Sequence, residues 1–129
     1  MSAGRIALTL AAGAAFTLGL GAVALPAAAA SGPDGEQLFR QRCQACHAAT
    51  AGKVSPLGPN LAGVVGRKAG SLPYAYSPAL KASGLTWTRA NLDKFLTGPA
   101  KMVPGTKMSI VVTDAGQRQA LVKYLSTAR

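Results

Sequence analysis

Hydrophobic and polar positions follow a helical period in three stretches of this 129-residue chain. The first stretch begins near Ser31 or Asp34, two side chains of the kind that cap helices. It places Leu38, Phe39 and Arg42 at helical spacing and ends at a pair of cysteines. The pattern therefore predicts a first helix from about position 34 to that pair.

A second helix is predicted between a threonine cap and a Gly-Pro stop. Thr86 or Thr88 can cap it, and Gly98 with Pro99 can end it because proline cannot continue a helix. One face of this segment gathers the apolar side chains of Leu92, Phe95 and Leu96.

A third helix is predicted from a cap at Thr113 or Asp114 to the C-terminus. Its apolar stripe consists of Leu121, Val122 and Leu125. No part of the chain alternates convincingly with the two-residue period of a strand. These patterns favour an all-α protein with large loops.

Residues 48–76 lack a sustained period and are rich in Gly, Pro, Ser and Lys. A structureless loop of that length is unusual in a compact domain unless it wraps around something. Aromatic residues after position 30 are too few for three helices to enclose a core readily. They are Phe39, Tyr74, Tyr76, Trp87, Phe95 and Tyr124. We therefore expect another large apolar body at the centre of the fold.

The first 30 residues have the pattern of a secretory signal peptide. Arg5 is their one charge, and an apolar run over residues 6–25 leads to Pro26 and a series of alanines. We expect cleavage after Ala30, which would leave one small domain at residues 31–129. The alternative is an uncleaved membrane anchor, since 20 apolar residues are just long enough to span a bilayer.

The formal net charge of +10 indicates a partner with acidic groups. One of the 14 Lys and Arg residues lies in the signal segment, so 13 basic residues against four acidic ones leave the remainder at +9. Nucleic acid is the usual expectation for such a charge. We predict no nucleic-acid binding, however, because an exported protein rarely meets it and the basic residues form no block.

All the cysteine and histidine of the chain lies in the pentapeptide CQACH at residues 43–47. A structural zinc site would need a fourth protein ligand that this cluster does not supply. A thioredoxin-like dithiol would follow a strand in a βαβ unit, and a disulfide closing so small a loop would stabilise little. These three readings remain as less favoured alternatives.

A fourth chemistry uses all three side chains of the cluster. On a helix Cys43, Cys46 and His47 stand at i, i+3 and i+4 and share one face. Two thiols can then join the two vinyl groups of a haem while the imidazole reaches the iron, and Cys-x-x-Cys-His is the established attachment signature of c-type haem. A haem would also be the apolar body that the long loop surrounds.

Counting restricts the second axial ligand of such an iron. No other histidine exists, so the remaining soft ligands are Met102 and Met108, with a lysine or an open position as further possibilities. Met108 is favoured because Pro104 and Gly105 turn the chain just before it. In the alternative without a functional role, both methionines pack in the core.

Eight short motifs follow one another between residues 34 and 129, namely GEQLF, CQACH, GPNL, GRKAG, YAYS, GLTW, PAKMVPGTKM and LVKYL. The series resembles the class I cytochromes c, the mitochondrial type and its bacterial relatives. The resemblance implies an all-α fold, the small cytochrome c fold of three to five helices and long loops around one covalently attached haem c.

The resemblance also implies a role for individual residues. Cys43 and Cys46 would carry the two thioether links, and His47 and Met108 would be the proximal and distal ligands of the iron. Pro59 would accept a hydrogen bond from the ring N–H of His47 and so orient it. The positions that match propionate-binding residues, and one near the propionates and the methionine loop, are Arg67, Tyr76, Trp87 and Thr106.

Three positions depart from the family pattern near the methionine. Phe95 stands where relatives carry a tyrosine that bonds the methionine sulfur, Leu80 where they often carry an asparagine, and Ile110 where an aromatic is common. The changes at Phe95 and Leu80 predict a drier methionine side. The same resemblance implies a close crossing of the first and last helices at Gly35, Phe39, Leu121 and Tyr124.

By this resemblance the protein would be a diffusible electron carrier and not an enzyme, monomeric and exported to the periplasm. Its expected donor is a membrane quinol-oxidising complex, and its expected acceptor is a terminal oxidase, a photosynthetic reaction centre or another reductase. Lys101, Lys107 and Arg42 would steer it to acidic docking patches on these partners. The alternatives are a module tethered by an uncleaved signal and a peroxidase-like haem enzyme with a labile sixth ligand.

Overall fold

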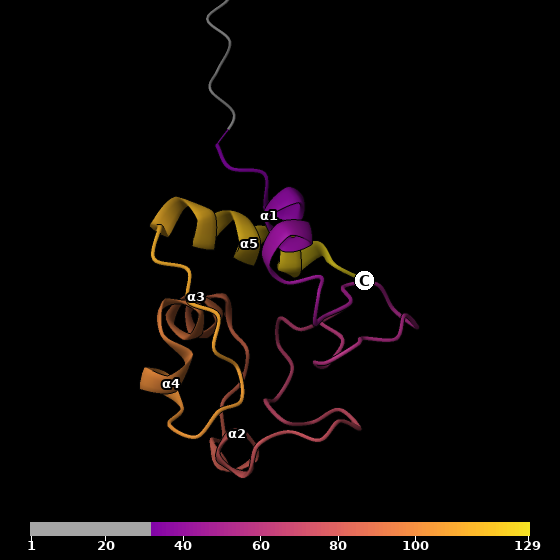
Figure 1. The fold of residues 1–129 in the computed structure, drawn as a ribbon, viewed down its shortest axis with the longest axis vertical. Helices are drawn as coiled ribbons and strands as arrows, with labels where there is room; N and C mark the ends of the chain where they lie inside the picture. Colours follow the sequence, from indigo (N-terminus) through magenta and orange to yellow (C-terminus); the bar gives the residue numbers. More distant parts are fainter. Residues whose placement is uncertain (1–31) are drawn as a thin grey trace, which may run out of the picture.

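The computed structural model describes residues 32–129, in which five helices are joined by long loops (Figure 1). They are α1 (Gly35–Arg42), α2 (Pro78–Ala82), α3 (Arg89–Thr97), α4 (Pro99–Met102) and α5 (Ala115–Thr127). No strand occurs within this range, where the one β-type pairing is an isolated bridge between Lys68 and Thr86. The all-α prediction is confirmed for the described chain. The predicted signal peptide, its cleavage point and the candidate cap Ser31 lie outside these residues.

Capping side chains decide where the three longer helices begin. The Asp34 carboxylate accepts from the N–H of Glu36 at 2.9 Å, and the Thr88 hydroxyl accepts from the N–H of Asn91 at 3.0 Å. Asp114 does the same for α5, accepting from the N–H of Gln117 at 2.7 Å. Each cap satisfies a backbone donor that the first turn of a helix leaves without a partner. The structure thus selects one residue from each predicted pair of caps.

Two short helices, α2 and α4, were not located by the periodicity. Both begin at a proline, whose fixed backbone angle suits the first position of a helix. Pro99 therefore does two things, because it follows the end of α3 at Gly98 and starts α4. Helices of five and four residues are too short to show an apolar period. The total of five agrees with the expected small cytochrome c fold.

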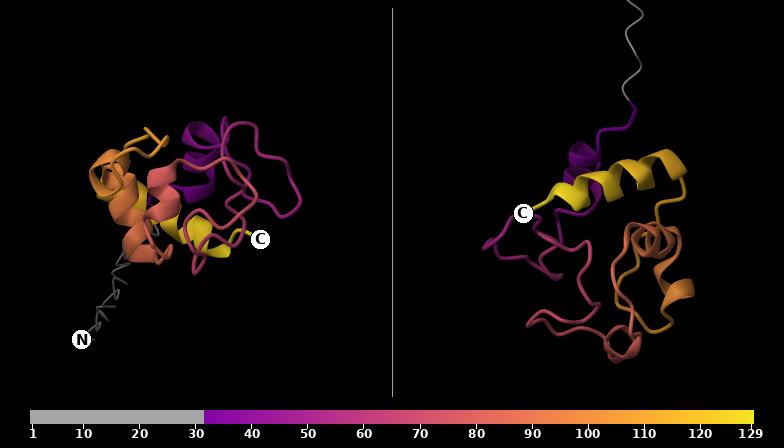
Figure 2. Two further views of the ribbon diagram at one scale, coloured as in Figure 1. Left: turned by 90° about the horizontal axis from the view of Figure 1, so that it is seen from below. Right: turned by 180° about the vertical axis from the view of Figure 1, so that it is seen from behind.

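The first and last helices cross in close contact, as the resemblance implied (Figures 1 and 2). A Cβ added at Gly35 would collide with the backbone carbonyl of Ala120 and would lie 2.9 Å from the Cβ of Tyr124. The rings of Phe39 and Tyr124 pack with their centroids 5.4 Å apart, and Leu121 is only 1% exposed. Glycine is required at this position because the two backbones approach so closely.

The remaining elements are arranged around the centre of the molecule. In Figure 1, α1 and α5 lie along one side, α3 and α4 follow on the next, and α2 lies opposite the helix crossing. The loop over residues 48–76 closes the fourth side and faces α3 and α4, and the views in Figure 2 agree. The fold therefore brings segments far apart in sequence to a common interior. No helix in the described part of the chain is long and apolar enough to cross a membrane.

Candidate functional site

The cysteine cluster lies on a turn directly after α1. α1 ends at Arg42, one residue before the cluster. The N–H groups of Cys46 and His47 both donate to the carbonyl of Cys43, at 3.0 and 2.9 Å. These are hydrogen bonds of i+3 and i+4 type, so the three side chains keep the spacing of one helical turn although the regular helix has ended.

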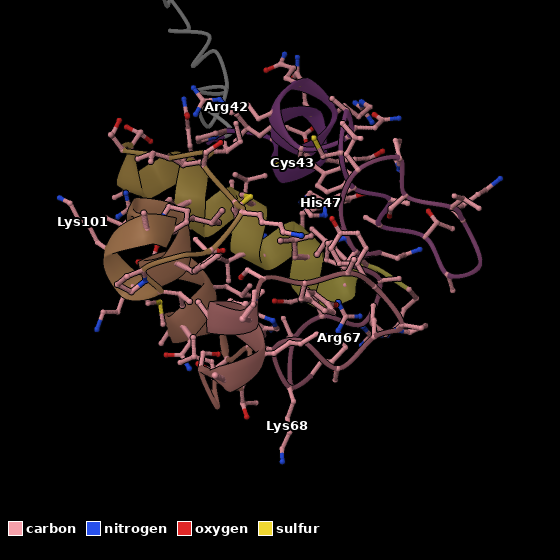
Figure 3. The ribbon with its side chains drawn as sticks, turned by 60° about the horizontal axis from the view of Figure 1, so that its bottom comes forward. Arg42, Cys43, His47, Arg67, Lys68 and Lys101 are labelled. Carbon is pink, nitrogen blue, oxygen red and sulfur yellow. The ribbon has the colours of Figure 1, made fainter. Side chains whose placement is uncertain are left out.

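A cavity of about 200 Å³ opens beside this turn. Its walls come from three parts of the chain, within residues 46–59, 74–80 and 106–110. It brings together His47 and Met108, which lie 61 positions apart in the sequence. Figure 3 shows His47 directed toward the interior from the end of the cluster. The lining residues are Cys46, His47, Leu57, Gly58, Pro59, Tyr74, Tyr76, Ser77, Leu80, Thr106, Lys107, Met108, Ser109 and Ile110.

The imidazole of His47 is oriented by the backbone of Pro59. The Nδ1 atom of His47 lies 2.7 Å from the carbonyl oxygen of Pro59. Because a carbonyl can only accept, the proton of a neutral imidazole resides on Nδ1, and Nε2 keeps its lone pair. The ring therefore offers Nε2 as a ligand for a metal, and the hydrogen bond at Nδ1 raises the basicity of that ligand.

Gly58 was missed by the sequence reasoning, although it stands beside Pro59 in the GPNL motif. A Cβ at this position would lie 2.7 Å from Nδ1 of His47 and in collision with the neighbouring ring carbon. Glycine is thus required for the imidazole to lie flat against the loop. The signal that could have found it is the glycine immediately before the proline whose carbonyl holds the ring.

The segment that carries Met108 reaches the cavity through a tight turn. Gly105 has a positive φ of 89°, which a residue with a side chain rarely adopts, and this is the turn predicted from Pro104 and Gly105. The N–H of Met108 lies 3.4 Å from the hydroxyl of Thr106, and the ammonium of Lys107 donates to the carbonyl of Ala75 at 3.0 Å. Met102, the other candidate, lies in α4 and is absent from the walls of this cavity.

Of the three predicted propionate donors, only Tyr76 lines the cavity itself. Burial lowers the pKa of Arg67, and its guanidinium donates to the carbonyls of Asn60 at 2.8 Å and Ala62 at 3.0 Å. Burial raises the pKa of Tyr76, and the positive charge of nearby Arg67 opposes that rise. Trp87 is buried and packs edge to face on Phe95, with centroids 4.9 Å apart.

Two of these donors remain without protein partners in the described chain. Within residues 32–129 the indole N–H of Trp87 and the hydroxyl proton of Tyr76 have no acceptor, since the backbone N–H of Leu72 beside the Tyr76 oxygen can only donate. No fully buried side-chain nitrogen or oxygen in this range lacks a hydrogen-bond partner, so both of these donor atoms are partly accessible. Such donors beside a basic guanidinium suit a ligand that carries carboxylates.

Tyr74 was also overlooked as a wall residue. Its hydroxyl donates to the carbonyl of Leu57 at 2.6 Å, and its ring meets that of Tyr76 edge to face, with centroids 5.0 Å apart. The pair occurs at i and i+2 in YAYS, a spacing that puts both side chains on one face of an extended segment. That spacing was the available signal.

Among the three cations expected at the exposed edge, only Lys107 lines the cavity. Figure 3 shows Lys101 extending away from His47 into solvent and Arg42 on the side of α1. Leu80 lines the cavity beside Met108, whereas Phe95 packs in the core against Trp87. The departure at Leu80 therefore affects the cavity directly, and the departure at Phe95 lies outside its lining.

The residues present fit a covalent haem better than the competing chemistries. Cys43 and Cys46 are not joined in a disulfide, and burial raises the pKa of Cys43. Within residues 32–129 no group of three or more His, Cys, Asp and Glu side chains is placed to hold a metal ion. An imidazole and a thioether share one largely apolar cavity, with Cys46 in its lining and Cys43 one turn earlier outside it, and this set matches the donors of a c-type haem.

The comparisons with known proteins agree with this geometry. The family model described as Cytochrome c matches residues 33–129. A cytochrome c of Tetrahymena pyriformis is 44% identical over 94 residues, which cover 72% of this chain and 84% of that protein. A cytochrome c2 of Rhodomicrobium vannielii is 45% identical over 95 residues, which cover 72% of this chain and 75% of that protein.

A solved structure, cytochrome cH from Methylobacterium extorquens, superposes with a TM-score of 0.67 at 44% sequence identity. The match covers 74% of this chain and 99% of that protein. Similarity in sequence and in fold therefore extends over the same part of the chain that forms the cavity and the helix crossing.

Proposed function

The chain belongs to the cytochrome c family. From that premise we propose that it is a one-electron carrier that diffuses in the periplasm between membrane complexes. Members of the family bind one covalent haem c and are electron carriers rather than enzymes. The protein accordingly holds one haem c through two thioethers and takes part in electron transport with redox partners. When bound, the haem supplies an iron that alternates between Fe(III) and Fe(II).

Five residues are proposed to hold the haem directly or to orient its ligand. Cys43 and Cys46 would carry the thioethers, and Nε2 of His47 and the thioether sulfur of Met108 would be the protein ligands of the iron. Pro59 orients the imidazole through the hydrogen bond at Nδ1. The supporting observation is that His47 and Met108 line one cavity from two distant segments. Two protein ligands of this kind would suit the haem to electron transfer rather than to oxygen or peroxide chemistry.

The propionates are proposed to meet the polar edge of the site. Tyr76 and Trp87 have donors that no described residue uses, and Arg67 brings a positive charge beside them. Thr106 lies in the wall next to Met108 and contributes its hydroxyl there. Donors of this kind offset the cost of taking two carboxylates out of water.

The proposed docking to acidic partners is supported by the way the protein uses its own acids. Asp34 and Asp114 cap α1 and α5, and Glu36 and Asp93 form the two ion pairs within residues 32–129. None of these carboxylates lines the cavity, whereas Lys107 does. Lys107 is therefore the one Lys, Arg, Asp or Glu residue in the lining, and its charge is positive. We expect association with partners to be fast at low salt and slower as salt is raised.

The partners and the location complete the proposal. The donor is a membrane quinol-oxidising complex, and the acceptor is a terminal oxidase, a photosynthetic reaction centre or another reductase. Residues 1–30 direct export and are then removed, leaving the domain at residues 31–129. The mass of the exported holoprotein tests this part. A mass that includes residues 1–30 would favour the tethered module instead.

The distal ligand is tested by Met108→Ala in the holoprotein. We expect complete loss of the sulfur-to-iron absorption band of the oxidised protein, a lower reduction potential, and binding of carbon monoxide by the reduced protein. The matched control is Met102→Ala, which should retain the band because Met102 lies outside the cavity. An unchanged band in Met108→Ala would show that another residue is the ligand.

A further inference from the structure

The segment from Met108 to the start of α5 is attached to the rest of the protein through Val112 and Thr113. Its first residues, 108–110, line the cavity, and the ribbon continues from there to the start of α5 (Figures 1 and 2). Val112 is 0% exposed, and its N–H donates to the carbonyl of Leu96 in α3 at 2.8 Å. Among the hydrogen bonds formed within residues 32–129, none involves Ser109, Ile110 or Val111.

The guanidinium of Arg118 closes the other side of this attachment. One of its terminal nitrogens donates to two successive carbonyls of the segment, that of Val112 at 3.0 Å and that of Thr113 at 2.7 Å. Its Nε donates to the carboxylate of Asp93 in α3 at 3.0 Å. The side chain of Arg118 is only 13% exposed, and that of Asp93 is 42% exposed. One side chain of α5 therefore ties the segment to both α3 and α5.

This pair differs from the other ion pair of the described chain. Glu36 and Arg40 lie four positions apart on α1, and their side chains are 57% and 52% exposed. That pair joins one helix to itself and contacts no loop through the hydrogen bonds of its side chains. Arg118 instead uses the planar fork of donors that distinguishes arginine from lysine, and it orients two backbone carbonyls as well as a carboxylate.

We propose that Arg118, held by Asp93, is a positioning residue for Met108, and that it limits how readily the methionine leaves the iron. Residues 109–111 have no hydrogen bonds of their own in the described chain, and two of them, Ile110 and Val111, are 42% and 47% exposed. The position of Met108 on this side is therefore determined at Val112, four residues later. Releasing Val112 and Thr113 lengthens the free segment and increases the population in which the thioether has moved away.

The inference rests on the proposed role of Met108, and it is tested by competition with free imidazole. Imidazole binds ferric haem when the distal ligand moves away, so its apparent affinity reports the population of the opened segment. In the holoprotein, Arg118→Ala should bind imidazole about tenfold more tightly. That factor equals about 1.4 kcal/mol, which is close to the net contribution of one hydrogen bond to a charged group.

Conservative variants separate positioning from folding. Arg118→Lys keeps the charge but loses the fork, and Asp93→Asn keeps the shape but loses the carboxylate charge, so each should give a smaller increase in imidazole affinity. The matched control is Arg40→Ala, which removes the exposed pair and the same charge, and it should change the affinity less than twofold. If Arg118→Ala does not fold, these two conservative variants carry the test.

The outcomes distinguish the positioning role of Arg118 from the assignment of Met108 as the distal ligand. Imidazole affinity within twofold of the parent in Arg118→Ala, or in both conservative variants where it cannot be made, overturns the positioning role. This holds even if urea unfolding shows lower stability. If Met108→Ala keeps its sulfur-to-iron band, the ligand assignment itself is wrong. A lost band in Met108→Ala with unchanged imidazole affinity in the Arg118 variants leaves the carrier proposal intact and removes only the positioning role.

Discussion

The helix crossing and the walls of the cavity that contains His47 and Met108 are held together by different interactions. At the crossing, protein side chains pack on one another, with Phe39 against Tyr124 and the backbone of Gly35 against Ala120. The cavity walls are largely loops, and side chains hydrogen-bond to loop carbonyls, within one loop as Arg67 does at Asn60 or between segments as Lys107 does at Ala75. The first region has its packing partners within the protein, and the second presents its inner face to the cavity.

This difference indicates which region determines the stability of the whole protein and which region can open locally. Burial of apolar surface between α1 and α5 supplies stability that any opening of the crossing would lose at once. A wall loop that is fastened by a few hydrogen bonds can open alone, because its backbone is near solvent and its apolar contacts are fewer. We therefore expect changes at the crossing to lower the stability of the whole protein and changes in the walls to act locally.

The largest effect is expected from Gly35→Ala at the crossing. The added Cβ would meet the carbonyl of Ala120 and the Cβ of Tyr124, which are backbone and near-backbone atoms that cannot rotate away. The helices must separate, and overpacking of this kind costs about 3 kcal/mol. Urea unfolding of the oxidised holoprotein, followed by its circular dichroism, measures the loss.

Gly32→Ala is the control for this substitution, because nothing lies within 4 Å of a Cβ at that position. It should leave the free energy of unfolding unchanged within about 0.5 kcal/mol. A Gly35→Ala protein as stable as this control would mean that the crossing can relax without cost, and that the contrast between the two regions is incorrect.

A smaller and local effect is expected from Asn60→Ala in the loop wall. The amide of Asn60 donates to the carbonyls of Thr50 and Lys53, both at 2.8 Å, and its oxygen accepts from the N–H of Ala62 at 2.8 Å. Since water can replace part of these bonds at exposed carbonyls, we expect a loss of about 1 kcal/mol. Native-state hydrogen exchange should show faster exchange of amides in residues 48–62, with little change in α1 and α5.

Asn91→Ala is the matched control for the loop substitution. Asn91 also donates a side-chain hydrogen bond to a backbone carbonyl, that of Thr86 at 2.8 Å, but it lies in α3. Its removal should affect exchange near residue 86 and leave residues 48–62 unchanged. If Asn60→Ala instead accelerated exchange in α1 and α5 to the same extent as in the loop, the loop would be part of one cooperative unit with the crossing.

The same contrast explains how much the sequence could predict. Regular packing leaves a period, so the apolar faces of α1, α3 and α5 and their caps at Asp34, Thr88 and Asp114 could be identified from spacing and residue type. The cluster at residues 43–47 was identifiable because its chemistry depends on a fixed short spacing. Patterns of this kind involve residues that are close together in the sequence, so the sequence alone predicts them.

Contacts between distant loop residues leave no such pattern. Nothing in the letters around Tyr74 shows that its hydroxyl meets Leu57, seventeen positions earlier, and Gly58 shows its need for close approach only once His47 is in place. The attachment of Val112 by Arg118 depends on how α3 and α5 pack, which is a property of the whole fold. The short helix α2 was not predicted for a different reason, since five residues cannot display a helical period.

The smallest effect is expected from the acid–base behaviour of the cavity wall, with Tyr76→Phe as the substitution. Burial raises the pKa of Tyr76 above its ordinary value near 10, although the positive Arg67 opposes the rise. The unfolded chain therefore releases this proton at lower pH than the native protein does. Stability associated with Tyr76 is complete below pH 10 and is lost as the pH rises through the higher native pKa.

In Tyr76→Phe the free energy of unfolding should fall less steeply above pH 10 than in the parent, by a modest amount because Tyr76 is partly exposed. Tyr74→Phe controls for the loss of a hydroxyl in the same wall, because that hydroxyl donates to Leu57. Equal slopes in the parent and in Tyr76→Phe would mean that burial of this phenol in the wall does not contribute to the alkaline sensitivity of the protein.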